Sequence, residues 1–101
     1  MMSLGEAPTA IIGAIDVLAV GALIEVQSCG KSAPVDLSII GINNLELGAH
    51  LSPALTTVHI PTFQIGETAA KQILARLKGE DVPRIVELPV ALVVRRSSGP
   101  A

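Results

Sequence analysis

The sequence predicts an α/β fold built on parallel strands. Short apolar, β-branched runs alternate with segments of helical periodicity, in the order β-α-β-(short α)-β-α-β. The strand candidates are almost continuously apolar, which is typical of parallel strands buried on both faces. The chain has 101 residues, half of them hydrophobic and 16% charged, enough for one small folded domain.

The first half contributes two strands and a long helix. Residues 9–14 (TAIIGA) and 37–42 (LSIIGI) have strand composition. Asp16 is expected to be the N-cap of a helix over residues 17–29, with Gly30 as the residue that ends it. Because this helix is apolar almost all round, we expect it to contact other elements on more than one face.

The second half is expected to hold a helical turn over residues 45–50, a strand over 55–60, a helix over 63–80 and a strand over 86–96. Thr62 is the expected N-cap of the second long helix, and Gly79 its stop. Pro89 suggests that the last strand lies at an edge or a crossover. The tail SSGPA is expected to be frayed.

Composition excludes several classes of function. One Phe and no Trp or Tyr argue against stacking of bases or sugars on aromatic side chains. A net charge of -2 with scattered basic residues gives no footprint for DNA binding by this chain alone. The single Cys29, the absence of a signal-peptide pattern and the lack of a long apolar stretch predict a cytoplasmic chain with no membrane segment. The pair Arg95-Arg96 is interpreted as a solvated strand end.

Three polar residues and Ile15 follow the first two strands where each ends. Ile15 and Asp16 follow the first, and Asn43 and Asn44 the second, so parallel neighbours would bring all four to one edge of the sheet. The two amides could bind a hydroxyl-rich or heterocyclic ligand through paired donors and acceptors. From spacing alone, turn formation is the stronger interpretation for both asparagines. For Asp16, helix capping is stronger than a catalytic carboxylate.

No pattern indicates catalysis, a metal or a cofactor. His50 and His59 have no acidic or thiol companion at metal-ligand spacing. Cys29 follows an apolar helix rather than preceding one, and neither a nucleophile elbow nor a phosphate loop is present. We therefore expect no enzymatic activity.

Four blocks taken together resemble one family. PTAIIGAIDVLAVGAL, APVDLSIIGINNLELGAHLSPALTTVHIP, IGETAAKQILARLKGE and VELPVALVVRRSS occur in the order found at the end of LacI/GalR-type transcriptional regulators. The resemblance covers residues 8–98, leaving 1–7 as leader or added residues and 99–101 as a frayed tail. It implies the C-terminal part of a periplasmic-binding-protein-like type I core, which binds effector and dimerises.

The resemblance also implies a function for the parent protein. Such regulators, often repressors, bind operator DNA through an N-terminal helix-turn-helix that this sequence does not contain, and a sugar or nucleobase-like effector binds between two lobes. In the family the second strand usually ends in an aromatic residue and Asp-Asp or Asp-Asn, whose first Asp binds effector. Here Asn43 takes that position without a charge. Ile15-Asp16 replaces a usual Asn-Asp pair, so an amide that often touches effector is lost.

The family dimerises through this lobe, which implies a homodimer or larger assembly. The matching interface positions are Val20, Leu23, Leu47 and Leu51, although a core role is equally compatible with their composition. The apolar face formed by Ile65, Ala69, Ile73 and Leu77 is also expected to join an assembly, since its packing partner in the family is the other lobe.

Two alternative functions stay open: a solute-binding protein of a transport system, and a stand-alone oligomerisation module.

Overall fold

The structure is a computed structural model that describes residues 7–101, so most of the expected leader lies outside the described residues. The chain forms two compact units. The first contains the residues up to His59 together with Ala91–Ala101, and the second contains Ile60–Val90.

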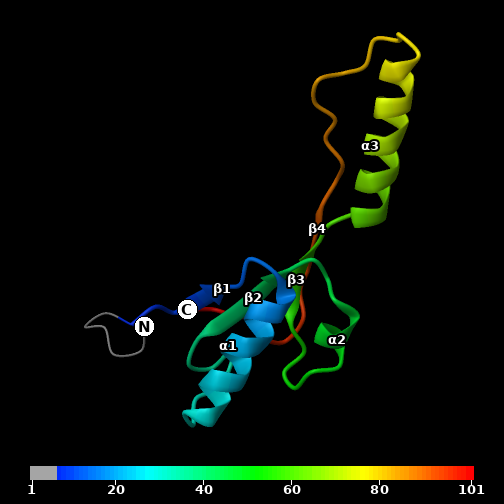
Figure 1. Cartoon of the computed structure of the whole chain (residues 1–101). Helices are drawn as coiled ribbons and strands as arrows, with labels where there is room; N and C mark the ends of the chain where they lie inside the picture. The colour runs from blue at the N-terminus through cyan, green and yellow to red at the C-terminus, as the bar shows by residue number, and fades with distance from the viewer. Residues whose placement is uncertain (1–6) are drawn as a thin grey trace. The chain divides into compact units, whose positions relative to one another are not determined.

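The first unit is built on a four-stranded sheet in the order β1-β2-β3-β4 (Figure 1). The strands are β1 (Ala10–Ile12), β2 (Ser38–Ile42), β3 (Thr56–His59) and β4 (Ala91–Val93). The first three run parallel, with Ile11 opposite Ile39 and Ile42 opposite Val58. The helix α1 (Asp16–Ser28) connects β1 to β2, and the single helical turn α2 (Glu46–Ala49) lies between β2 and β3. The α/β prediction is confirmed.

The last strand corrects the expectation of an all-parallel sheet. β4 pairs with β3 in the antiparallel direction and has three residues, whereas a strand over residues 86–96 was expected. The chain leaves the sheet after β3, forms the second unit and returns beside the strand that it left. Ala91, the first residue of β4, lies opposite His59, the last residue of β3, so the two strands run in opposite directions. Pro89, which has no backbone N–H to donate, precedes the paired segment.

One face of the sheet carries the hydrophobic core. Helix α1 packs against β2 and β1 on this face. The buried cluster consists of Ala19, Leu23, Val26, Ala33, Leu37, Ile39 and Leu55. On the opposite face Ile12 and Leu92 are 68% and 63% exposed. Within the first unit the sheet is thus covered on one side only, and α1 keeps Val17, Leu18 and Ile24 more than half exposed.

The C-terminal tail corrects a second expectation, because Ser97 and Gly99 are not frayed. Ser97 is fully buried: its hydroxyl donates to the Ile39 carbonyl and accepts the Thr56 N–H at 2.8 Å. The N–H of Gly99 donates to the Ser38 hydroxyl at 3.0 Å. Composition suggested a loose end, but these side chains complete the hydrogen bonds at the amino-terminal ends of β2 and β3.

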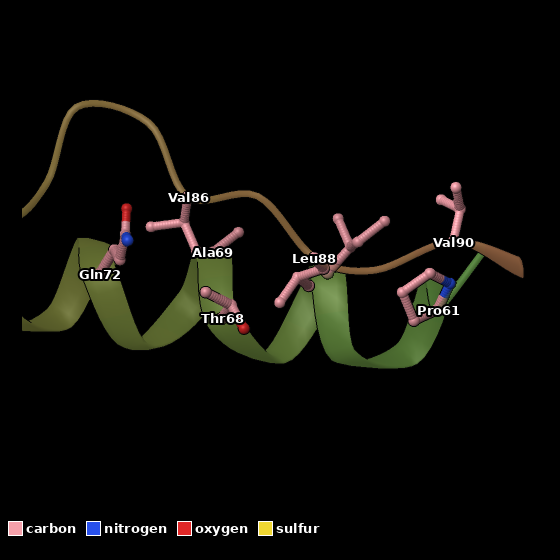
Figure 2. Close-up of a pocket in the computed structure, with 8 residues that line it drawn as sticks. Pro61, Thr68, Ala69, Gln72, Val86, Leu88 and Val90 are labelled. Carbon is pink, nitrogen blue, oxygen red and sulfur yellow. The ribbon is translucent and has the colours of Figure 1, made fainter.

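The second unit contains the predicted long helix, α3 (Thr62–Leu77), and an extended return segment. None of the α3 residues is buried, and Ile65, Ile73 and Leu77 are among its exposed apolar residues. A mostly apolar pocket of about 300 Å³ lies between α3 and the return segment (Figure 2), lined by Pro61, Ile65, Thr68, Ala69, Gln72, Val86, Leu88 and Val90. Within residues 7–101, no helix combines the length and apolar character that crossing a membrane requires.

The predicted helix ends are partly confirmed. Gly30 and Gly79 follow the C-caps of α1 and α3 with φ of 77° and 82°, the left-handed conformation that glycine adopts without strain. The predicted N-cap at Thr62 is wrong, because Pro61 is the N-cap and its carbonyl accepts the Ile65 N–H at 2.9 Å. No side chain caps this helix.

Candidate functional site

The carboxyl ends of β2 and β3 and the start of α1 lie at one edge of the sheet, because the strands are parallel. This edge, which we call the rim, consists of Ile15, Asp16, Asn43, Asn44 and His59. The rim therefore brings together the four residues that the sequence predicted there. It adds His59, which was interpreted only as a histidine outside any metal site.

Asn43 and Asn44 form a left-handed turn that ends β2. Their φ angles are 108° and 49°, a region that asparagine tolerates better than other residues with a Cβ atom. The N–H of Asn43 donates to the Val58 carbonyl at 2.8 Å, and the N–H of Asn44 donates to the Thr57 hydroxyl at 3.1 Å. Turn formation, the stronger interpretation from the sequence, is confirmed.

Asp16 is not an N-cap. The N-cap position of α1 belongs to Ile15, which makes no side-chain cap hydrogen bond, and Asp16 is the first helical residue. Its carboxylate is 2% exposed and accepts the Leu45 N–H and the Thr57 hydroxyl, each at 2.6 Å. Asp16 therefore ties the start of α1 to β3 and to the residue after the asparagine turn. The prediction that Asp16 is an N-cap was wrong because the hydrogen-bond donors to its carboxylate lie far away in the sequence.

The side chain of Asn44 is occupied by partners within the chain. Its Oδ1 accepts from Nη2 of Arg95 at 2.9 Å, and its Nδ2 lies 3.3 Å from Nδ1 of His59. Arg95 also donates through Nη1 to the Leu55 carbonyl at 2.9 Å. The interpretation of Arg95 as a solvated strand end is therefore wrong, although it fits the exposed Arg96.

The side chain of Asn43, in contrast, is exposed, and within residues 7–101 it makes no hydrogen bond. Ile15 is 49% exposed. Asp16 of the rim and Arg95, which is bonded to Asn44, are both engaged by hydrogen bonds inside the unit. The rim therefore presents a neutral amide and an imidazole rather than a free charge. No metal-ligand cluster occurs among the described residues.

The four predicted interface residues divide between core and surface. Leu23 is 3% exposed and belongs to the core, while Val20 and Leu51 are half-buried and pack against it. Leu47, on α2, is 53% exposed. Leu47 is the one member of this group with a largely free side chain in the isolated chain.

Comparison with known proteins identifies the family from nearly the whole length of the chain. Residues 1–98 match the periplasmic binding protein-like domain. This chain belongs to that family. It is 39% identical to the HTH-type transcriptional repressor PurR of Aliivibrio salmonicida over 98 residues, which is 96% of this chain and 29% of the repressor.

Solved structures of LacI-family regulators share the fold. A putative LacI regulator from Bacillus cereus subsp. cytotoxis superposes with a TM-score of 0.92 at 31% identity, over 99% of this chain and 36% of that one. A LacI family regulator from Enterococcus faecium with bound ribose gives a TM-score of 0.82 at 36% identity, over 95% and 36%. The resemblance to LacI-type regulators is thus confirmed, and this chain spans about a third of the length of such proteins.

Proposed function

We propose that this chain forms one wall of the effector-binding cleft of a LacI-type transcriptional regulator, with Asn43 as a direct contact to the effector. The observation that carries the proposal is the asparagine turn at the carboxyl edge of the parallel strands, where open α/β sheets bind ligands. Within this turn Asn44 is used internally, whereas the Asn43 amide is exposed and free to donate and accept.

The charges of the site favour a neutral effector, such as a sugar or a nucleobase-like molecule. Asp16 and Arg95 are both engaged inside the unit, and Asn43 stands where the family usually has a carboxylate. An amide matches a hydroxyl or a carbonyl group through one donor and one acceptor. The ribose bound to the Enterococcus faecium relative supports a ligand of this class.

The parent protein would be a cytoplasmic repressor that binds operator DNA through a helix-turn-helix outside this chain. The name of the PurR relative, an HTH-type transcriptional repressor, supports this arrangement over solute transport. In such a protein the effector would change operator affinity by binding one arrangement of the two lobes more tightly than another. No contact of this chain with DNA is needed for that mechanism.

Substitution of Asn43 is expected to abolish the weak binding of a neutral ligand. The ¹⁵N-labelled chain would be titrated with D-ribose and with adenosine up to about 10 mM, and binding would be followed by amide chemical shifts. Weak binding is expected because part of the cleft wall is absent, and a Kd near 1 mM corresponds to a binding free energy of about −4 kcal/mol. We expect shifts at residues 43–44 and 57–59, and their loss in Asn43→Ala. The control Gln64→Ala removes an exposed amide of α3 and should bind as the wild type does.

Two results would contradict this proposal. Asn43→Ala could retain wild-type binding, or the shifts could map to α3 and the return segment, where the mostly apolar pocket of Figure 2 lies. Either outcome would place the ligand away from the rim.

We also propose that the chain self-associates through a surface that includes Leu47. Support comes from the apolar side chains that the unit leaves exposed, Leu47 on α2 and Val17, Leu18 and Ile24 on α1, since their burial against a second chain would remove apolar surface from water. Leu47→Asp is expected to lower the molar mass measured by light scattering at about 100 μM toward that of a monomer, because a buried unpaired carboxylate opposes association.

Val35→Asp is the matched control, since Val35 is 85% exposed in the loop before β2. Its molar mass should equal that of the wild type. A monomeric wild-type chain, or equal masses for Leu47→Asp and Val35→Asp, would show that this surface is not the interface.

A further inference from the structure

His59 lies at the carboxyl end of β3, beside the asparagine turn that ends β2. Its ring is exposed, and within residues 7–101 its one hydrogen-bond partner is the amide of Asn44, which faces Nδ1. The function proposed above uses Asn43 and leaves this imidazole without a role. Histidine carries both a donor and an acceptor when neutral, so its contribution depends on which nitrogen holds the hydrogen.

The neighbouring side chains decide that question by elimination. A guanidinium can only donate, so Arg95, at 2.9 Å, requires that the amide oxygen of Asn44 face it. The NH₂ group of Asn44 then faces Nδ1 of His59, and an NH₂ group also only donates. Nδ1 must therefore accept, and the neutral ring carries its hydrogen on Nε2.

We propose that His59 is a second effector-contacting residue, a hydrogen-bond donor through Nε2 whose tautomer and orientation are set by Arg95 acting through Asn44. The group it would bind is an acceptor on a neutral ligand: a hydroxyl oxygen, a carbonyl oxygen or an unprotonated ring nitrogen. Arg95 is a positioning residue, since its guanidinium is engaged by Asn44 and by the Leu55 carbonyl. The ligand contact of His59 rests on the function proposed above, whereas its tautomer does not.

This arrangement explains why Arg95 and Arg96 differ although they are adjacent. Arg95 lies shortly after β4, and its side chain reaches Asn44, in the turn that ends β2, fifty-one positions earlier in the chain. Arg96 is exposed, and its backbone N–H donates to the Ala54 carbonyl at 3.0 Å. The pair thus offers a test variant and its control at neighbouring positions with the same side chain.

The tautomer can be measured without a ligand. Long-range ¹⁵N–¹H correlation of the histidine rings, recorded at about pH 8, distinguishes the two neutral tautomers, and the exposed His50 serves as an internal reference. We expect the Nε2–H form for His59 in the wild type, a mixture of tautomers in Arg95→Met, and recovery in Arg95→Lys, which restores a donor to Asn44. Arg96→Met should match the wild type. Asn44→Asp should move the hydrogen to Nδ1, since a carboxylate only accepts.

An Nδ1–H form in the wild type, or a tautomer unaffected by Arg95→Met, would overturn the proposal.

The ligand contact is tested in the same titrations with D-ribose and adenosine. His59→Phe is expected to weaken binding by about fivefold or more, as loss of one hydrogen bond of about 1 kcal/mol requires, while Arg96→Met binds normally. Unchanged binding by His59→Phe would overturn the contact. If neither probe binds the wild type, the proposed function and the contact both fail, whereas the tautomer result stands by itself.

Discussion

Gly13→Ala is expected to destabilise the chain by about 3 kcal/mol or more. A Cβ atom at Gly13 would lie 2.6 Å from the backbone nitrogen and 3.0 Å from the Cα atom of Ala19, in the first turn of α1. Because backbone atoms cannot rotate away as a side chain can, α1 would have to move off the sheet. The buried side chains of Ala19 and Leu23 would then lose packing with the core.

The matched control is Gly21→Ala on the same helix. Nothing lies within 4 Å of a Cβ atom built there, and alanine is the better helix former, so we expect a gain of about 0.5–1 kcal/mol. Urea unfolding followed by far-UV circular dichroism measures both, since the chain has neither Trp nor Tyr for fluorescence. Equal stability of Gly13→Ala and the wild type would mean that α1 does not approach the sheet as closely as described.

Removal of the Asp16 carboxylate is the second change with a large expected effect. Asp16→Ala leaves the Leu45 N–H and the largely buried Thr57 hydroxyl without their acceptors, and hydrogen bonds to charged groups contribute about 1.5–3 kcal/mol each. We expect a loss of about 3 kcal/mol in the free energy of unfolding. Asp16→Asn should lose less, since the amide oxygen still accepts and the Thr57 hydroxyl can turn to accept from the NH₂ group.

Asp36→Ala controls for the loss of an aspartate. Asp36 is exposed and accepts one local hydrogen bond, from the Ser32 N–H at 2.8 Å, so its removal should cost less than about 1 kcal/mol. A double-mutant cycle of Asp16→Ala with Thr57→Val isolates their pairing. Independent, additive effects would show that the two side chains do not interact in solution.

Local patterns in the sequence were sufficient to predict the two long helices and the glycines that follow their C-terminal ends. The four-residue repeat of Ile65, Ala69, Ile73 and Leu77 predicted α3, and the glycines at positions 30 and 79 marked where α1 and α3 end. These features depend on residues within a few positions of one another, so they can be recognised without knowledge of the fold. The family resemblance, which covers residues 8–98, was likewise recognisable from sequence and is confirmed.

The sequence predicted where the candidate site lies in the fold, but not the hydrogen bonds that its residues make. Parallel strand order placed Ile15, Asp16, Asn43 and Asn44 at one edge of the sheet, as observed. Their partners could not be predicted from local patterns: Asp16 bonds to Thr57, forty-one positions away, and Asn44 bonds to Arg95, fifty-one positions away. For the same reason Asp16 was mistaken for a helix cap and Arg95 for a solvated residue.

By itself, the sequence determined the α/β class, the order of the elements and the asparagine turn, because hydrophobic periodicity and turn chemistry act over a few residues. Only the tertiary structure decided that β4 runs antiparallel, that the tail is anchored through Ser97, and that Asn44 is used internally while Asn43 is free. Each of these depends on which distant donor meets which acceptor. Such pairing is fixed only when the sheet has brought the ends of the chain together.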